Sequence, residues 1–212
     1  MRSYLFTLLL VCTLPLFAQQ QAEAKVVLDR TAAAFEKAGG VKAHFRMQAF
    51  KNNRSLGESD GIIQLKGAKF VLKTPESITW FDGRTQWSYL TGSNEVNIST
   101  PTPGELQSIN PYALLSLYQK GFAYRLGVVK SLRGKSVYEV ILTATSLRQE
   151  LSRIVLYVAK ESYQPITINV EMRDKSRSLI TVTGYQAGLK YPDKVFVFNP
   201  KLYPRAEMID LR

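Results

Sequence analysis

The chain has 212 residues and a formal net charge of +11 at pH 7, from 28 Lys and Arg against 17 Asp and Glu. It contains one cysteine, Cys12, and one histidine, His44. An intrachain disulfide and a zinc site with several cysteine or histidine ligands are therefore excluded. A Ser-His-Asp triad would have His44 as its one possible base. The length suits one domain with a sizeable core, and no internal repeat is present.

Residues 1–18 have the pattern of a secretory signal peptide. One arginine precedes an apolar run that ends at Phe17, and Ala18 is followed by three glutamines. The run holds roughly a dozen residues, whereas a membrane-spanning helix needs about 20. We therefore expect cleavage after Ala18 or Ala24, export to the periplasm, and a single mature domain over residues 19–212.

Export changes what the cysteine and the charge imply. Cys12 lies inside the segment that we expect to be removed, and bulky side chains precede it rather than the small residues of a lipid-attachment site. We therefore expect no lipid anchor and no thiol in the mature chain. A strongly basic cytosolic protein would suggest nucleic acid, but export argues against such a partner. The basic side chains alternate along predicted strands, as on a solvated face, and transient contact with an anionic membrane surface or an acidic partner stays open.

The mature part begins with a predicted helix and a predicted strand. Residues 26–38 favour a helix, because Leu28, Thr31 and Phe35 form one stripe and Gly39-Gly40 ends the run. From residue 41 the hydrophobic period changes to two, which indicates a half-buried strand. Its apolar side carries Val41, Ala43, Phe45, Met47 and Ala49.

Short predicted strands follow over residues 61–65, 68–74 and 76–81, with turn residues between them. This spacing is typical of an antiparallel meander rather than of βαβ units. Asp82-Gly83 predicts a hairpin, because Asp-Gly supplies the positive φ angles that a type I′ turn requires. A further strand is expected at residues 94–99.

A second helix is predicted in mid-chain, over residues 105–119, after a proline-rich linker. Asn110 suits an N-cap, Pro111 suits the first helical position, and Gly121 suits the end. Apolar side chains cover most of the circumference of this helix, so it must be buried against something.

The strand pattern resumes at residues 122–130, 136–144, 151–160, 165–173, 177–186 and 195–198. The total is about eleven strands, with one helix in front of them and one in the middle. A sheet of this size curls, and two helices are too few to fill its concave face. We therefore expect a mainly β domain with a hydrophobic cavity.

No constellation of residues predicts catalysis. His44 lies on the polar side of the first predicted strand, where a surface role is expected. Carboxylates are sparse, with Glu58 and Asp60 in a polar turn and Glu171 and Asp174 at a strand end. No glycine-rich phosphate loop precedes a helix. We expect a binding protein that is not an enzyme and that has no cofactor and no metal ion.

The segment Asp82-Gly83-Arg84-Thr85-Gln86-Trp87-Ser88-Tyr89 resembles the D-G-(K/R)-T-x-W-x-Y hairpin of the LolA family of periplasmic lipoprotein carriers. The order of helices and strands around it is also similar. The resemblance implies an open half-barrel of about eleven antiparallel strands, covered by a helical lid. Such proteins take acylated lipoproteins from an inner-membrane transporter, shield the acyl chains, and deliver them to an outer-membrane receptor.

This resemblance assigns roles to particular residues, and it also implies a monomer. Lys66 stands where family members carry an arginine that holds the lid closed, and is therefore the predicted latch. The predicted cavity lining is Phe45, Met47, Ile63, Leu65, Phe70, Leu72, Trp80, Trp87 and Tyr89. The predicted lid contacts are Leu106, Ile109, Leu114, Leu115 and Leu117.

Two other functions stay open at this point. A lipoprotein receptor or an envelope sensor would use the same half-barrel, and a lipid anchor would favour the receptor. An envelope hydrolase acting on lipid or glycan is the third choice, and the lack of a nucleophile with its base argues against it.

Overall fold

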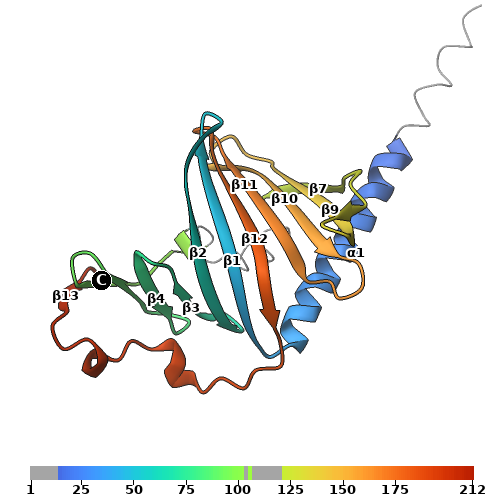
Figure 1. Ribbon diagram of the computed structural model, residues 1–212. Helices are drawn as coiled ribbons and strands as arrows, with labels where there is room; N and C mark the ends of the chain where they lie inside the picture. Colours follow the sequence, from blue (N-terminus) through green and yellow to red (C-terminus); the bar gives the residue numbers. More distant parts are fainter. Residues whose placement is uncertain (1–13, 103–104, 107–120) are drawn as a thin grey trace, which may run out of the picture.

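The computed structural model describes residues 14–102, 105–106 and 121–212, which form one thirteen-stranded sheet and one long helix (Figure 1). The strands are β1 (Gly40–Lys51), β2 (Arg54–Lys66), β3 (Lys69–Lys73), β4 (Ser77–Phe81), β5 (Gln86–Leu90), β6 (Glu95–Ser99), β7 (Phe122–Leu126), β8 (Ser131–Leu132), β9 (Lys135–Ala144), β10 (Leu151–Ala159), β11 (Pro165–Met172), β12 (Ser176–Gln186) and β13 (Glu207–Asp210). Two 3-10 helices, η1 (Asp193–Phe196) and η2 (Pro200–Leu202), lie between β12 and β13.

The sheet consists of two antiparallel meanders joined at its middle. From one edge the strand order is β13-β6-β5-β4-β3-β2-β1-β12-β11-β10-β9-β7, and β8 pairs with β9 outside this path. The junction is the long antiparallel pair of β1 with β12. The sheet is curved and does not close, and α1 (Leu14–Lys37) lies against its β7 and β9 end (Figure 1). The predicted mainly β, open antiparallel architecture is confirmed.

Helix α1 begins earlier than predicted, at Leu14 instead of residue 26. The segment before residue 26 is rich in glutamine and alanine, which favour helix. The predicted stripe is buried in part, since Leu28 and Thr31 are almost fully buried and Phe35 is half-buried. Gly39 ends the helix with a φ of 69°, as expected of a C-terminal glycine. Residues 1–13 of the predicted signal peptide lie outside the described residues.

Other differences from the predictions lie in the second half of the chain. The predicted strand at 122–130 is shorter and ends at Leu126, and a separate short strand, β8, follows. No strand forms at 195–198, because Val195 and Phe196 belong to the 3-10 helix η1, and the two residues after them are not in a strand. The helix follows Pro192, and the Val195 N–H donates to the Pro192 carbonyl at 3.0 Å. The last strand is instead β13, which pairs in parallel with β6. Over the described ranges, the sheet therefore has thirteen strands and one parallel pair.

Two separate hydrophobic clusters lie on opposite faces of the sheet. The larger cluster lies on the concave face and contains side chains of α1 together with side chains from β1–β4, β7 and β9–β12. The smaller cluster lies on the convex face of β3–β6. It is covered by residues 187–206, which we call the arm, and Phe196 and Phe198 of the arm are buried in it. The division into two clusters decides which predicted site residues share a face.

Candidate functional site

Six of the nine predicted lining residues share the concave face. Residues that pair across neighbouring strands point to the same face, and Ala43, Ile63 and Leu72 form one such row across β1–β3. A second row joins Val41, Leu65 and Phe70. The concave members of the predicted set are Phe45, Met47, Ile63, Leu65, Phe70 and Leu72.

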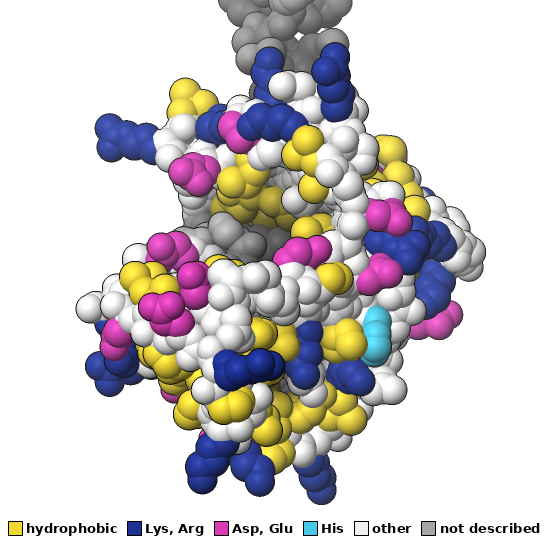
Figure 2. Space-filling model, turned by 60° about the vertical axis from the view of Figure 1, so that its left-hand side comes forward, with side chains coloured by type: hydrophobic (Ala, Val, Ile, Leu, Met, Phe, Trp, Pro, Cys, Tyr) yellow, Lys and Arg dark blue, Asp and Glu magenta, His cyan; other side chains and the backbone are white. Residues whose placement is uncertain are grey.

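These six residues differ in how far they are buried. Ile63, Leu65 and Phe70 are almost completely buried, whereas Met47 and Leu72 are only partly buried against the same cluster. Val170 and Val182, from β11 and β12, are likewise partly buried there. Figure 2 shows a hollow in the molecule with hydrophobic side chains inside it. The open apolar surface of the concave face therefore consists of its half-buried members.

The ring of Phe45 packs against a glycine on the concave face. The pairing of β1 with β12 shifts register between His44 and Phe45, which marks a β-bulge. The ring of Phe45 lies across Gly61 of β2, so close that a Cβ atom built on Gly61 would be 2.2 Å from Phe45 Cζ. Gly61 therefore leaves the space that the ring occupies.

The other three predicted lining residues, Trp80, Trp87 and Tyr89, lie on the convex face, and this part of the prediction is corrected. Trp80 pairs with Trp87 across β4 and β5, and all three belong to the cluster under the arm. Tyr203 of the arm lies 5.7 Å from Trp80 and 4.7 Å from Tyr89, between ring centroids. Phe81, next to Trp80, takes the concave position instead.

Apart from Leu90 at the end of β5, polar side chains take the concave positions on β5 and β6. Gln86 pairs with Phe81 and with Ser99, and Ser88 pairs with Thr79 and with Asn97. We call these five polar residues, Thr79, Gln86, Ser88, Asn97 and Ser99, the polar ladder. The polar ladder was not predicted from the sequence, although the alternation of Trp87 and Tyr89 with Gln86 and Ser88 was the available signal.

Of the predicted lid helix, residues 105–119, the structure describes only residues 105–106. Glu105 and Leu106 are helical, and Leu106 packs against the concave cluster. Thr102 begins this helix, because its Oγ1 and N–H both donate to the Glu105 carboxylate, at 2.8 and 2.7 Å. These bonds lower the pKa of Glu105. The remaining predicted lid contacts and the predicted N-cap lie outside the described residues, namely Ile109, Leu114, Leu115, Leu117 and Asn110.

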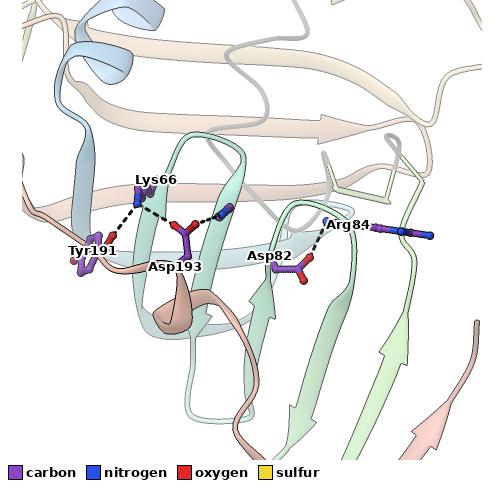
Figure 3. A network of polar contacts seen from close by, with 6 residues as sticks. Lys66, Asp82, Arg84, Tyr191 and Asp193 are labelled. Atoms are coloured by element: carbon purple, nitrogen blue, oxygen red, sulfur yellow. Dashed lines mark hydrogen bonds and ion pairs between the residues drawn. The ribbon is translucent and has the colours of Figure 1, made fainter.

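Lys66, the predicted lid latch, contacts the arm (Figure 3). Its ammonium donates to the Tyr191 carbonyl oxygen at 2.9 Å and to Asp193 Oδ1 at 2.9 Å. Lys69 contacts the other oxygen of the same carboxylate at 2.8 Å. The two ammonium groups lower the pKa of Asp193 to about 2. In the described part of the chain, Lys66 therefore holds the beginning of the arm. Most of the lid that it was predicted to latch lies outside the described residues, so the latch stays a prediction.

The hairpin after β4 also differs from its predicted turn type. Gly83 has a φ of 105°, but Arg84 is not in the left-handed region, so the turn is not type I′. The Asp82 carboxylate accepts a hydrogen bond from the backbone N–H of Arg84 at 2.9 Å (Figure 3). It also accepts one from the backbone N–H of Thr85, at 2.8 Å. This is the local bonding of an Asx turn.

The described residues hold no group of three or more His, Cys, Asp or Glu side chains arranged for a metal ion. His44 is exposed on the convex face, beside Ile62 and Gly184 on the neighbouring strands. Of the helices that the structure describes, none is long and apolar enough to cross a membrane. What the concave face offers chemically is an apolar surface bordered by polar groups.

Comparisons with known proteins agree with this geometry. An uncharacterized conserved protein from Thermus thermophilus has 13% identity and a TM-score of 0.60, over 89% of this chain and 99% of that chain. A DUF1329-family protein from Desulfovibrio piger has 11% identity and a TM-score of 0.51, over 84% and 97%. No curated protein matches the sequence. Residues 14–175 match the family described as outer membrane lipoprotein carrier protein LolA, and the chain belongs to that family.

Proposed function

We propose that this protein is an exported carrier that binds the acyl chains of lipoproteins on its concave face. It would take them from a lipoprotein-releasing transporter of the inner membrane to a receptor at the outer membrane. The family supports the lipoprotein as the ligand class. The observation that carries the proposal is the apolar concave face, whose members Met47, Leu72, Val170 and Val182 are only partly buried.

The need for such a surface follows from the cost of exposing acyl chains to water. Each methylene group moved out of a bilayer costs about 0.8 kcal/mol, so one long chain costs about 10 kcal/mol. An apolar surface that recovers most of this free energy makes release from a membrane feasible. Lid residues that cover the chains would recover more of it, and the burial of Leu106 against the concave cluster fits a lid that begins there.

The first test is native mass spectrometry of the protein purified from its own cell envelope. A bound lipid or lipoprotein adds mass, and the added mass identifies the ligand. Protein that is recovered empty and that also fails to bind a synthetic triacylated lipopeptide would contradict the carrier function.

A substitution on the concave face makes the test specific. Leu72→Glu places a charge among the acyl-contacting side chains, and because Leu72 is half-buried the sheet should stay folded. Burial of a carboxylate beside hydrocarbon is unfavourable, so lipopeptide binding should be lost. Thr143→Glu is the matched control, since it adds the same charge at an exposed convex position of β9. Equal binding by the two variants would exclude the concave face as the ligand site.

A further inference from the structure

The concave face changes its chemistry along its rows of paired residues. One row runs from Ala43 through Ile63 and Leu72, and continues into Thr79, Ser88 and Asn97. The neighbouring row is apolar from Val41 to Phe81 and then reaches Gln86 and Ser99. The acyl-binding surface therefore ends at the polar ladder defined above.

At this border the apolar side chains switch from the concave face of the sheet to its convex face. On β5 and β6 the apolar residues Trp87, Tyr89, Val96 and Ile98 point to the convex face, where the arm covers them. The polar ladder is thus turned toward the interior of the half-barrel. An ordinary sheet with one solvated face would place these polar residues outside.

Hydrogen bonds within the polar ladder satisfy only some of its polar atoms. Thr79 is 7% exposed, and its Oγ1 lies 3.3 Å from Ser88 Oγ. Gln86 Nε2 donates to the same Ser88 oxygen at 3.2 Å. Gln86 Oε1 is buried and has no hydrogen-bond partner among the residues that the structure describes. A buried acceptor without a donor is unfavourable, and an N–H group of a ligand would satisfy it.

We propose that the polar ladder binds the ester and amide groups that join the acyl chains to the first residue of the lipoprotein. This inference rests on the proposed function. An amide N–H of the ligand would donate to Gln86 Oε1, and ester carbonyls would accept from Ser88 Oγ and from the Asn97 amide nitrogen. Leu72 and Asn97 are three strands apart, or about 14 Å at normal strand spacing. Chains on the apolar rows can therefore end with their polar linkages at the ladder.

The test compares two ligands that differ in their linkages. The first is a synthetic triacylated lipopeptide, and the second is a pyrene-labelled long-chain alkane, which has no ester or amide. Ser88→Ala and Asn97→Leu should each weaken lipopeptide binding about fivefold, the usual effect of one hydrogen bond. Alkane binding should stay unchanged. Thr143→Val, on the convex face of β9, is the control that removes a hydroxyl group outside the ladder, and thermal unfolding confirms that each variant is folded.

The outcomes separate this inference from the function on which it rests. If both variants bind the lipopeptide as tightly as the wild type, or lose affinity for both ligands equally, the ladder does not recognise the linkages. If either variant fails to fold, Gln86→Leu replaces it in the same comparison of lipopeptide and alkane binding. If the wild-type protein binds neither ligand, the acyl-binding function itself is wrong.

Discussion

Gly61→Ala tests the packing of the Phe45 ring against Gly61 on the concave face. A Cβ atom on Gly61 would lie 2.2 Å from Phe45 Cζ, and 2.8 and 2.9 Å from the two Cε atoms. Contacts this short force the ring to move. The φ angle of Gly61 is not in the left-handed region, so alanine adds no backbone strain and the steric clash is the main effect. Phe45 is 7% exposed, which leaves the ring little room except toward the cavity.

The expected effect can be estimated from two opposing contributions. Overpacking of a buried site costs about 1–3 kcal/mol. Replacing glycine by alanine recovers about 0.4–1 kcal/mol through the entropy of the unfolded chain. Gly61→Ala should therefore lower the free energy of unfolding by about 1.3 kcal/mol, the difference between the midpoints of these two ranges. Urea unfolding measures this change, and lipopeptide titration should show weaker binding because the displaced ring would occupy the proposed acyl-binding space.

A double-mutant cycle with Phe45→Leu isolates the clash. Leucine does not extend across Gly61 as the ring does, so Gly61→Ala should cost about 1 kcal/mol less in that background than in the wild type. The reasoning would be refuted if Gly61→Ala were equally costly in both backgrounds. It would also be refuted if the single variant were as stable as the wild-type protein.

Two further predictions concern the convex face and the arm. Trp80→Ala should lower the free energy of unfolding by about 3–5 kcal/mol but leave lipopeptide affinity unchanged, because Trp80 packs under the arm; a large loss of affinity would contradict the placement. Lys66 and Lys69 lower the pKa of Asp193 from 3.8 to about 2, so the stability that this contact contributes is present above pH 3.8 and is lost as the pH falls through about 2. Tryptophan fluorescence should report arm release in that range, and a step that persists in Asp193→Asn would exclude Asp193 as its origin.

The sequence alone identified the class of fold and the family. The period of two from residue 41 onward, together with short strands separated by turn residues, predicted an open antiparallel sheet, and the sheet is confirmed. The hairpin motif around Asp82-Gly83 pointed to the family that residues 14–175 match. These features could be predicted because alternation and turn preference are properties of neighbouring residues. The predicted roles of the concave residues in binding stay proposals.

The tertiary structure decided which face each strand turns toward the cavity. A period of two shows that Trp80, Trp87 and Tyr89 lie on one side of their strands, but it is the same for either face. The arm, about 100 residues later in the chain, covers that side and leaves Gln86 and Ser88 facing inward. Lys66 likewise contacts Asp193 only because the arm passes beside β2 and β3. Contacts between segments so far apart depend on the whole fold, and local patterns do not contain them.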